Sequence, residues 1–380
     1  MRGIPSDRPR HILGINSGTS ADAVDLALIR VIGAGQDRQV EVLSSATAQF
    51  PIKLQEAVHL APHWDLGDVA RFDVALGAFF GRCGRGFLQR IDFPLAELTC
   101  AASHGQTVYH HDGDPLEGSL QLGDASALAH ALGADVVANF RVADLAMGGQ
   151  GAPISPFADW VLHGGESERV ILNLGGIANL TLLQPDQPPI AWDSGPANGP
   201  LDALMRAETS CGFDQDGALT ASGKVVEDLL TTLQEDDYFP LTVPKSTGLE
   251  RFGPSMAQKA RKSAPDARLE DLLATFAELL AWSVAESLKN AGWCGGPVYV
   301  AGGGLHNVGI HDALKRHLGS TRVFSYADLG FNPDTREAVA FALLGDAFLL
   351  SEPSTWPTTT GCHTPGVLGQ WSPGPILDRT

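Results

Sequence analysis

A segment rich in glycine and hydroxyl residues near the N-terminus carries the residue types that bind phosphate. It reads ILGINSGTSADAVDLALI, with apolar runs on both sides of the small residues and no lysine. The backbone N–H groups of Gly18, Thr19 and Ser20 would form a nest of donors for phosphate oxygens. The carboxylate of Asp22 or Asp25 would then hold Mg²⁺, which keeps most of its waters and takes one or two carboxylates. The alternative is an ordinary hairpin in which aspartate forms the turn.

A second candidate for chemistry is Asp193 in the segment WDSGPANG. It follows an apolar run and precedes a Gly-Pro turn, so we predict a carboxylate at the end of a strand that points into a cleft. General bases commonly occupy such positions, and an Asx-turn is the structural alternative. The segment ASHGQTVYHH is predicted to form a second polar loop. Its histidines, His104, His110 and His111, lack the ligand spacing of a zinc site, which favours a hydrogen-bonding role.

Other phosphate-binding and nucleophile motifs are missing from the sequence. It contains no Walker GxxxxGK[ST], no dinucleotide-binding GxGxxG and no GxSxG nucleophile elbow. The segment KSTG (residues 245–248) has a faint similarity to the KTG box of serine acylases but lacks a convincing S-x-x-K partner. In the first hairpin, the hydroxyls of Ser17, Thr19 and Ser20 could add to the backbone N–H donors for phosphate.

The composition favours a soluble enzyme with two cores. The chain has 380 residues, 44% of them apolar, and single cores rarely grow beyond about 250–300 residues. The formal charge is −18 without any Lys/Arg run, which argues against nucleic-acid binding and is attributed to solubility. The five Cys are scattered, and neither a signal region nor an 18-residue apolar run is present. We therefore expect a reduced, cytoplasmic protein without disulfides or membrane spans.

Apolar periodicity and turn residues predict alternating strands and helices, which favours a mostly parallel sheet with flanking helices. A cluster of structure breakers at 147–156 predicts a domain junction or a loop at a cleft. The Pro/Thr-rich tail after Ser351 is predicted to lie on the surface. The predicted segments are strand, turn and strand over 11–31, a helix over 72–91, a strand over 98–111, helix then strand over 124–140, and helices over 157–164, 269–292 and 336–350.

The hairpin predicted near the N-terminus has a counterpart later in the chain. Residues 12–18 (ILGINSG) and 171–176 (ILNLGG) each place an Ile-Leu-led strand before glycines, and a second apolar strand follows. A third glycine turn, residues 302–304, follows another strand. We infer an internal duplication that grips a nucleotide between two α/β domains. The predicted domains are residues 1–150, completed by residues 345–380, and residues 151–344.

Taken together, these motifs make the chain resemble the anhydro-N-acetylmuramic acid kinases, within the sugar-kinase, Hsp70 and actin superfamily. The resemblance runs from about His11 over nearly the whole chain, and its specificity comes from the order of the motifs. It implies an α/β fold of two related actin-like ATPase (ribonuclease H-like) domains with ATP in the interdomain cleft. The motifs are SGTSADAVD, SHGQTV, LQLGD, FRVADLAMGGQGAP, NLGGIANLT, WDSGPANGPLDA, FDQDGALTASGKV, PKSTGLERF, AGGGLHN and REAVAFA.

The reaction that the resemblance implies couples hydrolysis to phosphoryl transfer. Water opens the 1,6-anhydro bridge at the anomeric carbon, and the freed O6 takes the γ-phosphoryl group of ATP with the help of Mg²⁺. The product is N-acetylmuramic acid 6-phosphate, within cell-wall recycling. The resemblance also implies a homodimer. A carboxylate base suits the attacking water, whereas phosphoryl transfer needs mainly positioning and charge neutralisation.

The resemblance carries roles over to the matching positions of this sequence. Asp193 matches the general base that acts on water. Glu337 matches a residue that holds the sugar, although a carboxylate at a helix start is also favoured by the helix dipole. His104, Gln106 and Arg141 lie in matched segments that are expected to line the sugar site. The expected ATP-binding residues are Gly18, Thr19, Ser20, Ala21, Asp22 (also the metal ligand), Ala23, Val24, Asp25, Gly175, Gly176, Gly302, Gly303 and Gly304.

The sequence departs from the family pattern at five positions. Ala23 replaces a glycine of the ATP loop, which predicts a slightly different turn because alanine adopts a positive φ only at a cost of about 1 kcal/mol. Asn139, Val142 and Ala143 replace one carboxylate and two arginines of the family's DFRRRD segment. Guanidinium groups suit a carboxylate such as the lactyl group of muramic acid. Ala197 replaces another glycine.

Two alternative functions stay open on the sequence. A kinase for another 1,6-anhydro sugar, such as levoglucosan, would share these motifs without needing the lost arginines. A catalytically silent, nucleotide-binding scaffold is opposed by the retained carboxylates of Asp22, Asp193 and Glu337.

Overall fold

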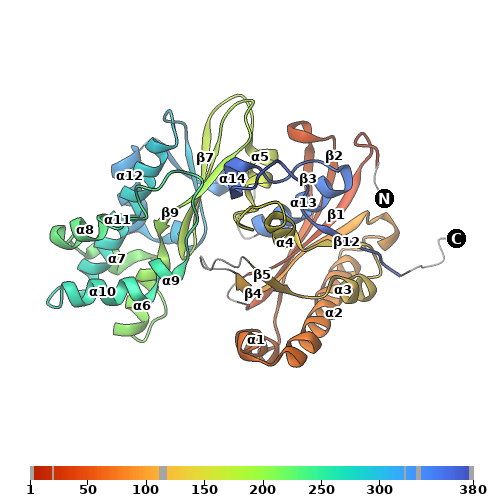
Figure 1. Ribbon diagram of the computed structural model, residues 1–380, viewed down its shortest axis with the longest axis horizontal. Coiled ribbons are helices and arrows are strands. Elements are labelled where there is room, and N and C mark those ends of the chain that lie inside the picture. Colours follow the sequence, from red (N-terminus) through yellow and green to blue (C-terminus); the bar gives the residue numbers. More distant parts are fainter. Residues whose placement is uncertain (1–3, 19–20, 111–117, 321, 331–334, 376–380) are drawn as a thin grey trace. The chain divides into compact units, whose positions relative to one another are not determined.

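The computed structural model describes residues 4–18, 21–110, 118–320, 322–330 and 335–375. Its contacts divide the chain into two compact units (Figure 1). Unit 1 comprises Met1–Leu162 together with Asp334–Thr380, and unit 2 comprises His163–Pro333. The domain boundaries predicted from the sequence, at residues 150 and 345, stay a prediction.

Unit 1 is built on a mixed seven-stranded sheet. β1, β2 and β3 form an antiparallel meander, and β4 and β6 continue the sheet parallel to β1. β5 pairs with β4 outside the main path, and β12 pairs antiparallel with β6. The order is β12-β6-β4-β1-β2-β3, where the strands are β1 (Arg10–Ser17), β2 (Ala23–Ile32), β3 (Gln39–Gln49), β4 (Cys100–His110), β5 (Ser119–Leu122), β6 (Val136–Ala138) and β12 (Gln370–Ser372).

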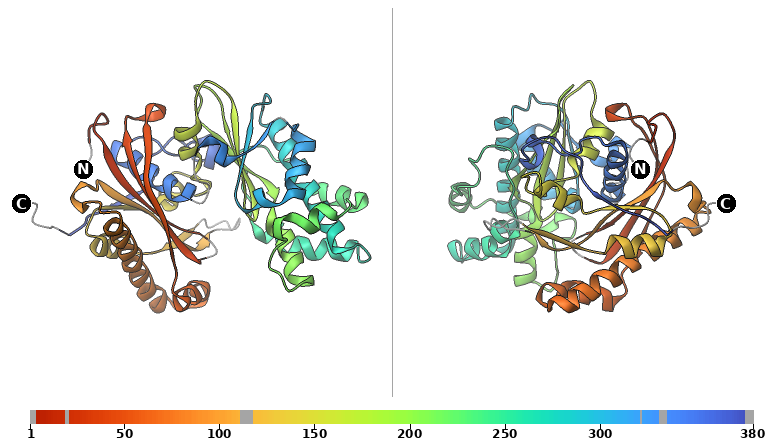
Figure 2. Two further views of the ribbon diagram at one scale, coloured as in Figure 1. Left: turned by 180° about the vertical axis from the view of Figure 1, so that it is seen from behind. Right: turned by 45° about the vertical axis from the view of Figure 1, so that its right-hand side comes forward.

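Helices cover both faces of this sheet (Figure 2). Because successive strand residues point to opposite faces, Leu13 packs in the core that contains α2 and α3, and Ile12 packs in the core that contains α13. The near-continuous apolar run of β1 is therefore the pattern of a strand buried on both sides. The helices of unit 1 are α1 (Ile52–Leu60), α2 (Leu66–Arg90), α3 (Ala125–Leu132), α4 (Phe140–Leu145), α5 (Pro156–His163), α13 (Arg336–Leu350) and α14 (Pro357–Thr360).

Unit 2 is built on a five-stranded sheet of order β11-β10-β7-β8-β9. Its strands are β7 (Arg169–Leu174), β8 (Ile177–Leu183), β9 (Ile190–Pro196), β10 (Val298–Ala301) and β11 (Val323–Ser325). Its core includes Trp192 of β9 and much of α11. The helices are α6 (Asn198–Glu208), α7 (Ala218–Ser222), α8 (Glu227–Gln234), α9 (Leu249–Phe252), α10 (Pro254–Ser263), α11 (Leu269–Asn290) and α12 (Val308–Leu318).

The two sheets share one topology, which confirms the predicted duplication. In unit 2, β7, β8 and β9 form an antiparallel meander, and β10 and β11 continue the sheet parallel to β7. These strands match β1, β2, β3, β4 and β6 of unit 1 in order and direction. The α/β class with two related domains is therefore as predicted.

Three local predictions were wrong. The strand predicted over 98–111 is present as β4, but its residues 102–110 do not form the predicted polar loop, and residues 192–196 of the predicted loop WDSGPANG lie in β9. Polar residues in these segments favoured a loop, but in the folded chain their side chains find hydrogen-bond partners on neighbouring strands and loops. The tail after Ser351 is not a surface wrap, since Thr355, Trp356 and Leu368 are buried and β12 extends the sheet of unit 1.

The predicted helices over 72–91, 157–164, 269–292 and 336–350 are present as α2, α5, α11 and α13, and the helix and strand predicted over 124–140 are present as α3 and β6. α3 ends at Gly133, which adopts the left-handed conformation (φ 86°) that favours glycine. Among the described residues, no helix combines the length and apolar character that a membrane crossing requires.

Candidate functional site

Asp193 lies in the middle of β9 rather than at a strand end, and only 5% of it is exposed. One carboxylate oxygen accepts a hydrogen bond from the side-chain amide of Asn179, its cross-strand partner on β8. The other oxygen accepts from the backbone N–H of Thr247 (2.9 Å) and the hydroxyl of Ser246 (3.2 Å). The carboxylate is thus buried and held from both sides by neutral donors.

Burial raises the pKa of Asp193 to about 6. The donors Thr247, Asn179 and Ser246 lower this pKa, because hydrogen bonds to a carboxylate favour its charged form, and the nearby charge of Glu250 raises it. Desolvation is the largest effect. The result is a carboxylate that is ionised at neutral pH and more basic than an exposed aspartate.

Sequence reasoning missed the three donors to Asp193. Asn179 sits 14 residues away and Ser246 and Thr247 sit 53 and 54 residues away. The latter two belong to the KSTG segment, which resembles the KTG box of serine acylases only faintly. The segment is part of PKSTGLERF, one of the ordered motifs, so the sequence could have singled it out. The motif alone does not predict that Ser246 and Thr247 contact Asp193.

The two glycine turns predicted in unit 2 meet around Asn198, at the start of α6. Its side-chain amide donates to the carbonyls of Leu174 (3.0 Å) and Gly175 (2.9 Å). A Cβ on Gly302 would lie 2.7 Å from the carbonyl oxygen of Leu174, so only glycine permits this close approach. Gly302 also has a positive φ of 84°. Gly175, Gly176 and the turn 302–304 therefore form one continuous backbone surface.

A cavity of about 660 Å³ lies beside these turns in unit 2, within the size range of small-ligand pockets. Phe213, 57% exposed, offers an aromatic face, and Asp202, Arg206 and His306 offer polar groups. Sequence reasoning predicted only Gly303 of its lining. The lining residues are Asn198, Leu201, Asp202, Arg206, Gly212, Phe213, Asp214, Gln215, Asp216, Gly303, His306 and Asn307.

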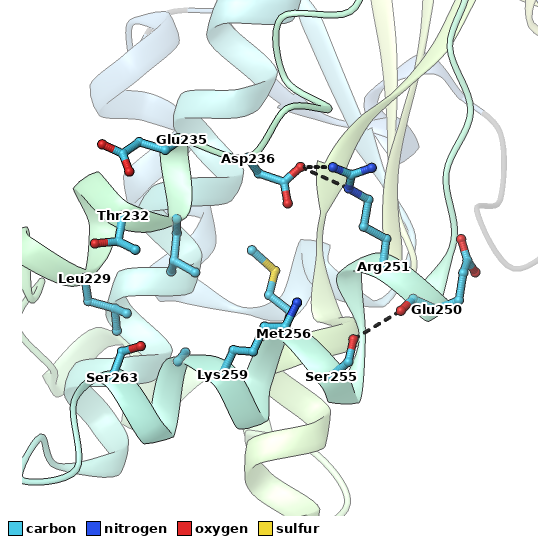
Figure 3. A pocket seen from close by; sticks show the side chains of 12 residues that line it. Leu229, Thr232, Glu235, Asp236, Glu250, Arg251, Ser255, Met256, Lys259 and Ser263 are labelled. Atoms are coloured by element: carbon cyan, nitrogen blue, oxygen red, sulfur yellow. Dashed lines mark hydrogen bonds and ion pairs between the residues drawn. The ribbon is translucent and has the colours of Figure 1, made fainter.

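A second cavity of unit 2, about 640 Å³, lies among α8, α9 and α10 (Figure 3). Arg251 of α9 points across its edge and pairs with Asp236, which follows α8 (Figure 3). Lys259 and Met256 of α10 project toward the same space (Figure 3). No residue predicted from the sequence lines this cavity.

Unit 1 brings together the residues predicted to line the sugar site. Arg141 of α4 donates from Nε to Nε2 of His104 on β4 (3.0 Å) and from Nη1 to the carbonyl of Gly151 (2.8 Å). The His104 ring stacks on Phe341 of α13. On the same helix, Glu337 accepts from the side-chain amide of Asn16 (2.7 Å).

Gln106 joins the phosphate-loop segment to β4. Its Oε1 accepts from the hydroxyl of Ser17 (2.6 Å), and its Nε2 donates to the carbonyl of Gly18 (3.1 Å). Further along β4, Nδ1 of His110 lies 2.9 Å from the hydroxyl of Ser119, in keeping with a hydrogen-bonding role. His111 lies outside the described residues.

The ionisable pair in unit 1 is strongly affected by burial. Burial, with the charge of Arg141, holds the pKa of His104 well below its usual value, so the ring is neutral at pH 7. Burial also lowers the pKa of Arg141 to about 10, against the attraction of Glu337 and Asp144. Nε2 of His104 accepts the bond from Arg141, so the proton of the neutral ring is on Nδ1.

The predicted ATP loop is described only in part, because Thr19 and Ser20 lie outside the described residues. Asp22 is exposed at the start of the second strand, where a carboxylate can reach a hydrated cation. Asp25 faces Asn16 across the hairpin and accepts a hydrogen bond from Thr47 (2.8 Å). Val24 is buried in the core of unit 1.

The structure places Ala23 in a strand, and the slightly different turn expected of this loop stays a prediction. Ala23 is an extended strand residue paired with Gln49, so it needs no positive φ. Among the described residues of this loop, Ala21 has a left-handed backbone (φ 51°), and it is fully buried. Ala197, the other replaced glycine, has a φ of −124° and likewise needs no left-handed backbone.

The three replaced residues of the NFRVAD segment do not displace the retained arginine. Val142 is 47% exposed, and Ala143 packs at the edge of a core of unit 1. Asn139 has a positive φ of 59°, which asparagine tolerates better than most residues, and its amide donates to Gln370. Arg141 remains the residue of the segment that contacts His104.

Comparisons with known proteins agree on one family. The family described as "Anhydro-N-acetylmuramic acid kinase" matches residues 10–374. Proteins of that name from Caldanaerobacter subterraneus subsp. tengcongensis (33% identity; 96% of this chain, 97% of the relative) and Bacillus cereus AH820 (31%; 96% and 100%) are similar to the chain. A ROK hexokinase structure from Thermus thermophilus covers 88% of this chain and 99% of its own at 14% identity, but its TM-score of 0.38 carries no argument.

Proposed function

We propose that this chain, which belongs to the anhydro-N-acetylmuramic acid kinase family, opens the 1,6-anhydro ring of anhydro-N-acetylmuramic acid and phosphorylates the freed O6. The chain is a kinase that transfers a phosphoryl group from ATP to a sugar hydroxyl. The finer steps, the product N-acetylmuramic acid 6-phosphate and the role in cell-wall recycling are our proposal. The observation that carries it is the buried, donor-held carboxylate of Asp193.

Asp193 is assigned as the general base. Its pKa of about 6 keeps it ionised near neutral pH and makes it a better proton acceptor than an exposed aspartate. Asn179 and Thr247 fix the carboxylate by hydrogen bonds to opposite oxygens, which supports a base of defined orientation. It would take a proton from water that attacks the anomeric carbon, while O6 leaves toward phosphorus rather than toward an acid.

The cavity of about 660 Å³ in unit 2 is assigned to adenosine. Phe213 provides a surface on which a base can stack, and the turn 302–304 presents backbone without side chains. In unit 1, the segment Gly18 to Asp25 is assigned to phosphate contacts. Asp22 is the carboxylate that would hold Mg²⁺, and the ion would supply positive charge against the phosphate oxygens.

His104, Gln106, Arg141 and Glu337 are assigned to the sugar. The partly buried guanidinium of Arg141 suits the lactyl carboxylate of muramic acid, a group that levoglucosan lacks. Val142, which stands where the family has an arginine, is exposed, so the loss of that arginine does not remove a cation from this cluster. Levoglucosan kinase activity is the second candidate, because Val142 and Ala143 still leave fewer cations than the family pattern.

The test of the substrate is a direct competition. Transfer of labelled γ-phosphate is measured on anhydro-N-acetylmuramic acid and levoglucosan side by side, in water enriched in ¹⁸O. We expect a preference for the muramic sugar, and one ¹⁸O at the anomeric carbon of the product. Transfer only to levoglucosan would replace the substrate assignment, and a phosphorylated product without ¹⁸O would refute coupled hydrolysis.

The test of the base is Asp193→Asn. We expect turnover to fall by about 10³-fold or more, because general bases contribute about 10²–10⁴-fold. ATP affinity, measured by calorimetry, should stay within about twofold, since Asp193 does not line the cavity assigned to adenosine. Turnover near the wild-type rate would show that another group accepts the proton.

A further inference from the structure

A buried lysine lies beside the Asp193 carboxylate without a role in the chemistry above. Lys245 is 6% exposed. Its ammonium donates to two backbone carbonyls, of Tyr238 (3.1 Å) and Phe239 (2.9 Å), and lies 4.5 Å from the centre of the Tyr238 ring. These contacts close residues 238–245 into a loop around one cation.

Such a lysine is costly to bury. Burial lowers its pKa to about 8, against the attraction of Asp193, and lysines are rarely buried unless they are paired. Two carbonyls and an aromatic face compensate the desolvation only in part. A feature that costs stability and touches the environment of a base is a candidate for a functional role.

The loop that Lys245 closes surrounds Asp193 at the level of the backbone. The hydroxyl of Tyr238 donates to the carbonyl of Asp193 (2.8 Å), and the N–H of Asp193 donates to the carbonyl of Lys245 (2.9 Å). The next two residues, Ser246 and Thr247, supply two of the three donors to its carboxylate. The positions of the Ser246 hydroxyl and the Thr247 N–H therefore depend on the contacts that fix Lys245 in place.

We propose that Lys245 is a positioning residue for Asp193, which rests on the proposed role of Asp193 as base. The ammonium clamps the carbonyls of Tyr238 and Phe239, and this clamp sets the Thr247 N–H and the Ser246 hydroxyl against the carboxylate. Lys245 itself does not touch the carboxylate.

The other charged groups near the clamp act from its outer side. Arg251 lies 5.6 Å from the centre of the Tyr238 ring; it pairs with Asp236 at the cavity of Figure 3 and also with Asp237. Glu250 raises the pKa of Asp193 by its charge. Burial raises the pKa of Tyr238, so its hydroxyl stays protonated and keeps its bond to Asp193.

The first experiment needs no substrate. The ¹³C-labelled carboxylate of Asp193 is titrated by NMR in the wild type, Lys245→Met and Lys245→Arg. We expect the Asp193 pKa to rise in Lys245→Met, because misplaced donors and a missing cation both favour the neutral carboxyl. Lys245→Arg should restore much of the difference. An unchanged pKa in Lys245→Met would overturn the proposal, whatever the protein phosphorylates.

The second experiment measures turnover. In Lys245→Met we expect kcat to fall by about 100-fold, the scale of a small misplacement of a reacting group, while KM for ATP changes by less than about twofold. The acid limb of the pH–rate profile should move to higher pH. Lys262→Met, on the exposed side of α10, is the matched control and should resemble the wild type.

The outcomes separate the possible failures. A lower melting temperature with a wild-type acid limb and kcat would make Lys245 merely structural and refute positioning. If Lys245→Met does not fold, Lys245→Gln, whose amide reaches at most one of the two carbonyls, is titrated and assayed in its place and decides by the same criteria. A wild type inactive on every anhydro sugar would refute the proposed function, while the NMR titration would still decide the role of Lys245.

Discussion

The carboxylate of Asp193 is buried and accepts hydrogen bonds from Asn179, Ser246 and Thr247, so burial and hydrogen bonding act on its pKa in opposite directions. Burial is the larger effect, and the pKa settles at about 6. A charged carboxylate at this position is therefore less stable in the folded protein than in water. The site keeps a reactive group at the expense of folding stability.

This balance predicts a pH dependence of stability. The pKa in the folded state, about 6, is higher than the usual 3.8, so between these values the folded state binds more protons. The free energy of unfolding should then fall as pH rises from about 4 to 6, by about 3 kcal/mol at 1.36 kcal/mol per pH unit of difference. Asp193→Asn should lack this decline in urea denaturation. Parallel curves for the two proteins would contradict the prediction.

At the scale of elements, α2 approaches α3 through a row of glycines. Gly77, Gly81 and Gly84 lie three or four residues apart and so share one face of the helix. A Cβ at Gly81 would lie 2.5 Å from the carbonyl oxygen of Leu128 on α3, closer than real contacts allow. Gly86, on the same helix, has only a distal guanidinium nitrogen of Arg90 at 3.7 Å.

These two glycines predict opposite effects of one substitution. Gly81→Ala should lower the free energy of unfolding by about 1–3 kcal/mol, because α3 must move away. Gly86→Ala should raise it by up to about 1 kcal/mol, because alanine favours the helix. Thermal or urea denaturation of both variants checks the pair. Equal effects of the two substitutions would show that the close approach of α3 does not matter.

At the scale of the whole molecule, the chain returns to unit 1 after completing unit 2, and its tail supports the predicted sugar residues. Thr355 and Thr360 each donate to the fully buried Asp144 (2.7 Å). Asp144 also accepts from the N–H of Gly151, whose carbonyl holds Arg141. Thr355 and Thr360 of the tail thus connect through Asp144 to Arg141, a side chain assigned to substrate.

Removing both hydroxyls tests this connection. The double variant Thr355→Val, Thr360→Val should lose about 3–6 kcal/mol of stability in unit 1, since each bond to a buried carboxylate contributes about 1.5–3 kcal/mol. Hydrogen exchange should accelerate in α4 and β6 while β7 to β9 stay protected. Thr364→Val, at an exposed position of the tail, is the control. Faster exchange in both units alike would argue against a local role of the tail.

The sequence by itself determined the elements and their repetition. The apolar runs before residues 18 and 175 end in glycines and so predict hairpins. Local sequence is enough for this, because strand faces and turns depend on neighbouring residues. The order of motifs likewise indicated the family. Local patterns misled for residues 102–110, part of which was expected to be a polar loop, and for the tail after Ser351, because polar side chains in both segments bond to distant partners.

The tertiary structure alone decided which side chains meet. Asn179 reaches Asp193 through the register of β8 with β9, and Lys245 positions its donors through a loop from elsewhere in the chain. Among the described residues of the first hairpin, it gives a left-handed backbone to Ala21 and an extended backbone to Ala23. Burial, which sets the pKa of Asp193, Lys245 and His104, is a property of packing between segments far apart in sequence. Local composition cannot predict these pKa values, because desolvation depends on what the rest of the chain places around a group.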